Sequence, residues 1–185
     1  YPLSQTDINL ISTASSLHDI GKISISGDIL NKPGRLTAEE FEIIKGHSLI
    51  GAKMLSELPL DQQEAPLVKV ASDICRWHHE RYDGSGYPDG LKGEQIPIAA
   101  QVVALADVYD ALTSERCYKK AYSHSKALEM IFEGRCGAFD PTLLQCLLEI
   151  SDTLESELGQ AALERNARHR RDTKGRIDYD NLLAR

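Results

Sequence analysis

The sequence has no apolar run near the about 18 residues that a membrane-spanning helix needs, and its N-terminus lacks the basic and apolar regions of a signal peptide. Its four cysteines are widely spaced and form no C-x-x-C pair, which disfavours a disulfide framework or a structural zinc site. Its 21 basic residues are outnumbered by 28 acidic ones, giving a net charge of −7. Non-specific binding to duplex DNA or to an anionic membrane is therefore disfavoured. Together, these absences predict a cytoplasmic chain with reduced thiols.

The chain has 185 residues, of which 42% are hydrophobic, as expected for about one globular domain. Apolar residues recur at helical spacing and no strand-like alternation competes, so we expect an all-α bundle. The expected helices cover residues 7–17, 67–79, 98–113, 126–132 and 142–158, with another that opens at Thr37. Because the apolar pattern thins after Ser151, we expect a domain over residues 1–150. Residues 151–185 would then form a helical extension or a mobile charged tail.

The helix that opens at Thr37 carries a histidine on its inner face. Thr37 and Glu40 form a capping box. The inward stripe follows at intervals of three and four residues through Phe41, Ile44, His47, Gly51, Met54 and Leu58. His47 is therefore expected to point into the core, four residues before a glycine that allows a close approach.

Histidines and carboxylates stand on or beside these apolar stretches, namely His18, Asp19, His47, His78, His79 and Asp107. A His-Asp pair alone, or one buried histidine, is more often structural. Six such residues together would leave several polar groups unpaired in the core, and a metal cluster removes that cost. Imidazoles and carboxylates without thiolates favour a di-iron or di-manganese centre. Zinc or nickel can occupy such a site in a purified sample.

An ordered set of segments resembles the HD-GYP domains, a subgroup of the HD metal-dependent phosphohydrolases. The set comprises residues 17–23 (LHDIGKI), 29–34 (ILNKPG), His47 with Gly51, residues 78–80 (HHE), 83–88 (DGSGYP) and 106–113 (ADVYDALT), and Arg116 with Lys119. The match covers roughly residues 7–150. It implies a helical bundle around a di- or trinuclear metal site, with a long glycine-rich loop that contains the Gly-Tyr-Pro motif.

The resemblance also implies a function in bacterial second-messenger signalling, the hydrolysis of cyclic di-GMP to pGpG and often then to GMP. The implied cofactors are two or three divalent metal ions, usually iron or manganese, bridged by Asp19 and held by His18, Asp19, His47, His78, His79 and Asp107. Lys22 would lie near the scissile phosphate. The other implied substrate contacts are Gly86, Tyr87, Pro88, Arg116 and Lys119.

Two metal ions about 3.5–4 Å apart can hold a hydroxide between them and clamp the phosphate, so no serine or cysteine nucleophile is needed. Asp19 and Lys22 are the candidate catalytic residues, with Lys22 stabilising charge or protonating the leaving oxygen. Without the motif, Lys22 would be read as a solvated lysine and residues 83–93 as an ordinary connector. Arg116 and Lys119 would likewise form only a solvated basic face.

The sequence departs from the family in three places. Family members usually carry an upstream helix with a further histidine, and in trinuclear members a glutamate, whereas the 17 residues before His18 contain no histidine. Ser26-Gly27-Asp28 stands where a Pro-Asp is more frequent, and residues 135–141 replace a Gly-Thr-His-Phe-Asp-Pro form.

Two alternatives to the phosphodiesterase remain open. One is a catalytically weak domain that acts as a nucleotide-binding or protein-interaction module. The other is a phosphohydrolase for another nucleotide, such as a related cyclic dinucleotide. The expected macromolecular partners are a regulatory receiver or sensor domain and a second copy in a homodimer.

Overall fold

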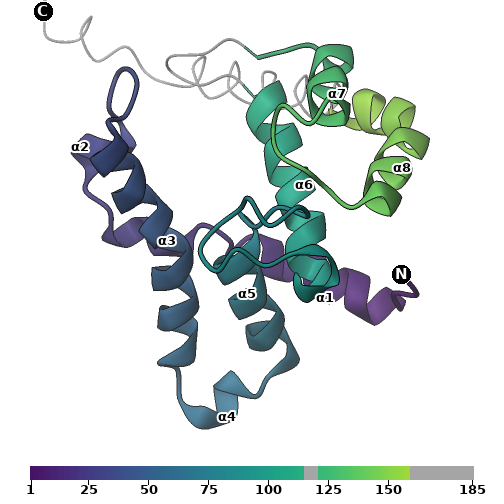
Figure 1. The fold of residues 1–185 in the computed structure, drawn as a ribbon. Coiled ribbons are helices and arrows are strands. Elements are labelled where there is room, and N and C mark those ends of the chain that lie inside the picture. Colours follow the sequence, from purple (N-terminus) through teal and green to yellow (C-terminus); the bar gives the residue numbers. More distant parts are fainter. Residues whose placement is uncertain (115–120, 159–185) are drawn as a thin grey trace, which may run out of the picture. The chain divides into compact units, whose positions relative to one another are not determined.

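The structure is a computed structural model that describes residues 1–114 and 121–158. Every regular element in this part of the chain is helical, which confirms the predicted all-α class (Figure 1). The α-helices are α1 (Gln5–Ser15), α2 (Gly27–Leu30), α3 (Ala38–Ser56), α4 (Leu60–Gln63), α5 (Pro66–Trp77), α6 (Ile98–Thr113), α7 (His124–Phe132) and α8 (Pro141–Glu149). Two 3₁₀ helices, Ile20–Ser24 and Gly93–Gln95, lie in connections, and residues 151–158 are also helical.

The predicted helix boundaries agree with the structure to within two residues for α1, α5, α6 and α7. The predicted helix over residues 142–158 is instead interrupted, because α8 ends at Glu149 and Ile150 forms a turn. The four-residue helices α2 and α4 were not predicted, since so short a segment shows no helical periodicity.

The start of α3 confirms the predicted capping box. The Thr37 hydroxyl accepts a hydrogen bond from the amide of Glu40, and the Glu40 carboxylate accepts one from the amide of Thr37. Phe41 was predicted to face inward, but its side chain is 44% exposed. The prediction is wrong because α3 contributes to the central apolar cluster only from its C-terminal half, through Ala52 and Leu55.

The central apolar cluster lies among α1, α3, α5 and α6. α3 packs along α5, and α4 lies in the connection between them (Figure 1). The cluster consists of Ile11, Ala14, Ala52, Leu55, Ala71, Ile74, Cys75, Ala99 and Val103. Its many alanines let the helices approach closely, which brings together the polar side chains on and beside them.

The segment after His18 packs tightly against α3. A Cβ atom on Gly21 would lie 2.0 Å from the carbonyl oxygen of His47 and 2.6 Å from the amide nitrogen of Gly51. Only glycine therefore fits at position 21. Gly51 is the glycine expected to allow a close approach, and Gly21 is the residue that lies opposite it.

The chain divides after Leu144, and the core and the candidate site belong to the first unit, Tyr1–Leu144. Within the described residues, no helix combines the length and the apolar character that crossing a bilayer requires. Cys75, Cys136 and Cys146 are free thiols.

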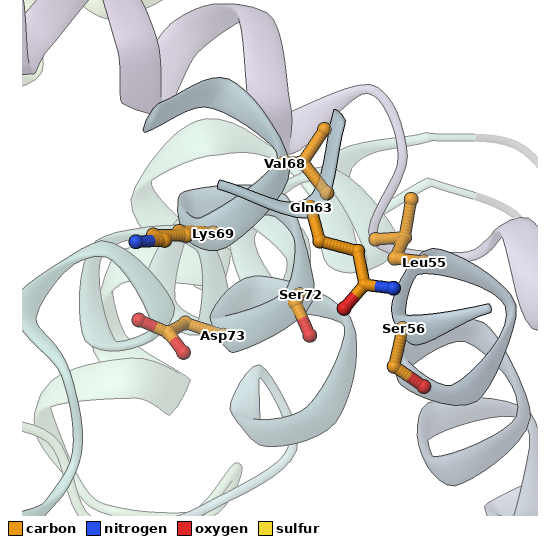
Figure 2. A pocket seen from close by; sticks show the side chains of 7 residues that line it. All are labelled: Leu55, Ser56, Gln63, Val68, Lys69, Ser72 and Asp73. Carbon is orange, nitrogen blue, oxygen red and sulfur yellow. The ribbon is translucent and has the colours of Figure 1, made fainter. Parts of the chain in front are cut away.

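A cavity of about 350 Å³ opens between the C-terminal end of α3, α4 and α5 (Figure 2). It is lined by Leu55, Ser56, Gln63, Val68, Lys69, Ser72 and Asp73. With no histidine and a single carboxylate, this lining does not contain the expected metal ligands.

Candidate metal centre

Three histidines are oriented by carbonyl groups of their own chain segments. His18 follows α1, His47 lies on α3 and His78 caps the C-terminus of α5. Their Nδ1 atoms lie 2.8 Å from the Ser15 oxygen, 2.6 Å from the Ile44 oxygen and 2.8 Å from the Ile74 oxygen, respectively. A carbonyl oxygen only accepts hydrogen bonds, so each Nδ1 carries the hydrogen. In the neutral ring, Nε2 is then left with a free lone pair.

These lone pairs converge near the carboxylate of Asp19. The Nε2 atoms of His47 and His78 are 3.3 Å apart. Asp19 Oδ1 lies 3.3 Å from the Nε2 of His47 and 4.0 Å from that of His78. His79 adjoins them, and ligand atoms of His47, His78 and His79 all lie within 4.8 Å of one another.

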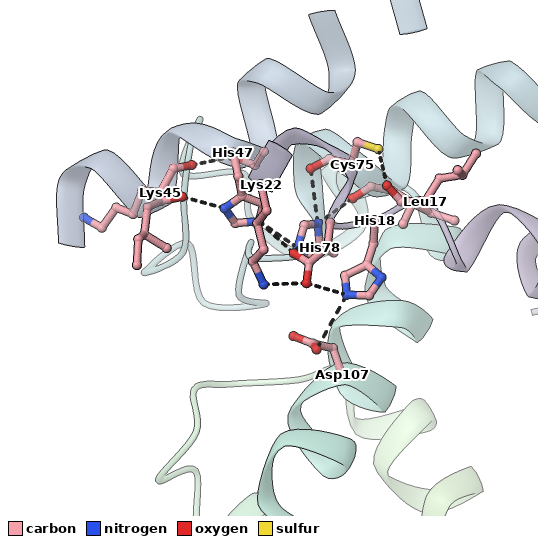
Figure 3. A network of polar contacts seen from close by, with 12 residues as sticks. Leu17, His18, Lys22, Lys45, His47, Cys75, His78 and Asp107 are labelled. Atoms are coloured by element: carbon pink, nitrogen blue, oxygen red, sulfur yellow. Dashed lines mark hydrogen bonds and ion pairs between the residues drawn. The ribbon is translucent and has the colours of Figure 1, made fainter. Parts of the chain in front are cut away.

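The second oxygen of Asp19 faces a different group of side chains. Asp19 Oδ2 lies 3.3 Å from the Nε2 of His18 and is in contact with the ammonium of Lys22. The same Nε2 of His18 lies 3.7 Å from Oδ1 of Asp107, on α6. Figure 3 shows His18 joined to Asp107 by a dashed line, with Lys22 beside His47. The two Asp19 oxygens thus face two separate sets of donor atoms.

The donor set fits a bound cation. Asp19 Oδ1 is buried and has no hydrogen-bond donor, and the nearest atoms are lone-pair nitrogens, so the acceptors repel one another unless a cation lies between them. Two nitrogens that bind one ion at about 2.1 Å each are about 2.9–3.4 Å apart, and the separation here is 3.3 Å. Imidazole and carboxylate donors suit first-row divalent metals.

Burial keeps the histidines on the Oδ1 side in the neutral form that binds metal. Burial lowers the pKa of His47 below its usual value, that of His78 to about 4 and that of His79 to about 2. For His18, the hydrogen bond with Asp19 raises the pKa. Burial alone would raise the pKa of Asp19, but its contacts with His18 and Lys22 outweigh burial and lower the pKa. Asp19 is therefore ionised at neutral pH.

The glycine-rich loop lies beside this cluster and brings an aromatic ring to it. The Tyr87 ring stacks on the His79 ring, with centroids 4.7 Å apart and planes inclined by 29°. A Cβ atom on Gly86 would lie 2.4 Å from the backbone of both Glu80 and Arg81, so this glycine allows the loop to reach the histidines. Burial raises the pKa of Tyr87, which keeps its hydroxyl protonated.

Glu80 anchors the loop, a role that the sequence analysis missed. Its side chain is 2% exposed, and its Oε1 accepts hydrogen bonds from the amides of Asp89 at 2.8 Å and Gly90 at 3.1 Å. Asp89 in turn accepts hydrogen bonds from the side chains of Arg76 and Trp77. The position of Glu80 directly after the two histidines was the available signal, but its partners lie nine and ten residues further along the chain.

A second missed feature lies on the exposed side of α3. The Phe41 ring makes an edge contact with Tyr87, with centroids 6.5 Å apart. The Lys45 ammonium lies over both rings, 5.1 Å from the Phe41 centroid and 5.4 Å from the Tyr87 centroid. Phe41 and Lys45 stand four apart on a helix, the spacing of side-chain neighbours. That spacing does not predict that the glycine-rich loop adds Tyr87 to this pair.

The structure brings together the six predicted metal-binding side chains and places Lys22 against Asp19. Gly86 and Tyr87 of the predicted substrate loop lie beside them, followed by Pro88. The predicted substrate contacts Arg116 and Lys119 lie outside the described residues.

Comparisons with known proteins identify the family of this chain. A family model described as an HD domain matches residues 3–143. The chain is 46% identical over 147 residues to a protein of Vibrio cholerae named probable cyclic di-GMP phosphodiesterase, an alignment that covers 79% of this chain and 33% of that protein. It is 44% identical over 158 residues to the cyclic di-GMP phosphodiesterase response regulator RpfG of Xanthomonas campestris, covering 85% of this chain and 40% of that protein.

A third relative has a different named substrate. The 3'3'-cGAMP-specific phosphodiesterase 2 of Vibrio cholerae is 39% identical over 149 residues, which cover 80% of this chain and 28% of that protein. The chain thus spans well under half the length of these relatives. The HD domain implies divalent metal binding, and the histidine cluster offers the ligands. Because the family model matches well over half of its residues, the chain belongs to the HD domain family, as its ordered sequence motifs indicated.

Proposed function

We propose that this chain is the catalytic domain of a metal-dependent phosphodiesterase that hydrolyses cyclic di-GMP to pGpG and then to GMP. The observation that carries the proposal is the Asp19 carboxylate, whose two oxygens face two separate groups of donor atoms. That arrangement suits a two-metal site, which is a common solution to phosphodiester hydrolysis. The names of two relatives support cyclic di-GMP as the substrate.

The proposed ligands fall into two sets that share Asp19. One set is His18, Asp107 and Oδ2 of Asp19, and the other is His47, His78, His79 and Oδ1 of Asp19. Because the described residues offer two such sets, we favour two metal ions. Neutral imidazoles and carboxylates suit iron or manganese.

The metal ions, when bound, supply a nucleophile at neutral pH and neutralise charge on the phosphoryl oxygens. Asp19 belongs to both ligand sets and so fixes their positions relative to each other. The carbonyl groups that pair with His18, His47 and His78 keep the imidazole rings oriented. Lys22 contacts Asp19, so its ammonium can stabilise charge on the phosphate or donate a proton to the leaving oxygen.

We assign recognition of the substrate to groups beside the metal ligands. The loop residues Gly86, Tyr87 and Pro88 offer a half-buried aromatic ring and backbone groups next to His79. Arg116 and Lys119, outside the described residues, would bind the phosphates or the guanine. Local positive charge of this kind permits anion binding by a chain with a net charge of −7.

The test is product formation by the metal-loaded chain. The chain is purified anaerobically with ferrous iron or manganese, its metal content is measured, and cyclic di-GMP hydrolysis is followed by chromatography. We expect release of pGpG and then GMP, and loss of both products in Asp19→Asn, which keeps the size of the side chain. Binding of cyclic di-GMP by a metal-replete chain without turnover would instead identify a nucleotide-binding module.

A second candidate substrate is 3'3'-cGAMP, because one of the relatives bears that name. Measuring kcat/KM for both cyclic dinucleotides with the same preparation decides between them.

We further place the domain in the cytoplasm, where an intracellular second messenger is encountered. Because one relative is named a response regulator, we propose that a receiver or sensor domain controls it. We also propose that it acts as a homodimer.

A further inference from the structure

The half-buried Tyr87 side chain lies beside the proposed metal ligands with its hydroxyl unpaired. Its ring stacks on the His79 ring, with centroids 4.7 Å apart, and its amide donates a hydrogen bond to the His79 oxygen at 3.3 Å. The hydroxyl makes no hydrogen bond to any residue that the structure describes. Because burial raises the pKa of Tyr87, that hydroxyl stays protonated and can donate to an acceptor on a ligand.

Two side chains of α3 also contact the Tyr87 ring. Phe41 meets it edge-on, with centroids 6.5 Å apart and planes inclined by 80°. Lys45 Nζ lies 5.4 Å from the Tyr87 centroid and 5.1 Å from that of Phe41. These are the geometries of a favourable edge-to-face ring pair and of cation–π contacts. The Tyr87 ring is therefore in contact with α3 as well as with His79.

The core of the domain does not account for Phe41 and Lys45. Phe41 is 44% exposed and is not a member of the central apolar cluster. The Lys45 ammonium pairs with Glu42 at 2.6 Å, but the Glu42 side chain is 68% exposed, and an ion pair with so exposed a partner contributes little to stability. The contacts with Tyr87 give these two side chains a role that core packing does not.

The backbone of the loop does not by itself fix the Tyr87 ring. Glu80 holds the amides of Asp89 and Gly90, and the Tyr87 amide is bonded to His79. With the backbone fixed, a side chain can still change its rotamer about the Cα–Cβ bond. Only contacts to the ring remove that freedom, and Phe41 and Lys45 provide them from outside the loop.

We propose that Phe41 and Lys45 are positioning residues that hold the Tyr87 ring against His79, so that its hydroxyl is directed to the substrate. This inference rests on the proposed function and deepens it, because it names residues that set the affinity for cyclic di-GMP. Tyr87 would contact a part of the cyclic dinucleotide that a small phosphodiester lacks. Phe41 and Lys45 would act through Tyr87 and not touch the substrate themselves.

The first test compares KM for cyclic di-GMP and for a small chromogenic phosphodiester among metal-replete variants. Phe41→Leu and Lys45→Met should each raise the KM for cyclic di-GMP about two- to fivefold, as expected for the loss of one ring contact, and leave kcat and the small substrate unaffected. Lys45→Arg should restore the KM, because a guanidinium also packs on aromatic rings. Lys53→Met is the matched control, since Lys53 lies on the same helix, pairs with Glu57 and is 73% exposed.

A double-mutant cycle separates positioning from direct contact with the substrate. In a Tyr87→Leu background, Lys45→Met should cause no further rise in the KM for cyclic di-GMP, because the ring through which Lys45 acts is gone. A further rise as large as that in the unaltered chain would overturn the proposal, since Lys45 would then bind the substrate itself.

The placement of the ring can also be measured without activity. In the chain labelled with 3-fluorotyrosine, the fluorine NMR signal of Tyr87 is assigned by its loss in Tyr87→Phe. We expect this signal to shift in Phe41→Leu and Lys45→Met but not in Lys53→Met, and an unshifted signal in both α3 variants would overturn the proposed contacts.

The two proposals fail in different ways. If the unaltered chain hydrolyses cyclic di-GMP and neither Phe41→Leu nor Lys45→Met raises its KM, this inference alone is wrong. If the unaltered, metal-replete chain does not hydrolyse cyclic di-GMP, the proposed function is wrong and this inference is overturned with it.

Discussion

Acidification should destabilise the metal-free domain because His47 and His78 are buried, and His79 is half-buried, as neutral bases. Burial lowers the pKa of His47, brings that of His78 to about 4 and that of His79 to about 2. An unfolded histidine has a pKa of about 6.5. As the pH falls from about 6.5 to 4, the unfolded chain therefore takes up protons that the folded chain does not bind.

The sign and size of the effect follow from this difference. Stability falls with the pH in this window by up to about 1.4 kcal/mol per pH unit for each such histidine. His18 acts differently, because its raised pKa gives stability that is fully present below about pH 6.5 and is lost as the pH rises through its folded value. With two or three histidines acting together, a loss of up to about 3–4 kcal/mol per pH unit is large against a total stability of about 5–15 kcal/mol.

The assay is urea unfolding of the chelator-treated chain between pH 7.5 and pH 4.5. We expect the free energy of unfolding to fall steeply below pH 6.5, and His78→Gln to reduce the slope by about 1.4 kcal/mol per pH unit. The same titration with saturating manganese is the control for the metal ligands. Equal stability of the metal-free chain at pH 6.5 and pH 5 would refute the placement of these rings as buried neutral bases.

Three further predictions concern single side chains of the proposed site. Asp19→Asn should reduce metal content, because an amide replaces the shared carboxylate; full metal content by elemental analysis would contradict the bridging role. Lys22→Gln should keep its metal but lose about a hundredfold in kcat, and an unchanged kcat would remove Lys22 from the chemistry. Gly86→Ala puts a Cβ atom 2.4 Å from the backbone of residues 80–81 and should displace Tyr87. The KM for cyclic di-GMP should then rise more than that for a small chromogenic phosphodiester, and equal changes would indicate general misfolding.

The helices were predictable where a local signal is strong. The capping box at Thr37 marks the start of α3, and the apolar pattern of residues 98–113 gives both ends of α6. The pattern failed at Phe41, because helical spacing gives one face of a helix but not how much of that face its neighbours cover. The break at Ile150 has no signal in the residues around it that we can identify.

The sequence nominated the side chains of the proposed metal centre, but it did not predict their arrangement. Histidines and carboxylates on apolar stretches, together with the family resemblance, pointed to six side chains that the structure brings together. Their distances depend on how four segments pack, which spacing along the chain does not show. The roles of Gly21 and Glu80 were not predicted for the same reason. Gly21 contacts α3, and Glu80 binds amides nine and ten residues further along the chain.

Local hydrogen bonds orient the histidine rings of the proposed centre, and helix packing brings these rings together. His18, His47 and His78 each bond through Nδ1 to a carbonyl three or four residues earlier, so the helix or turn that carries each ring also aims its Nε2. These Nε2 atoms lie close together because α1, α3 and α5 approach closely over alanine-rich surfaces and because Gly21 lies directly against α3. A larger residue in this packing would therefore separate side chains that are still correctly oriented, so we expect affinity at the proposed metal site to depend on core residues outside it.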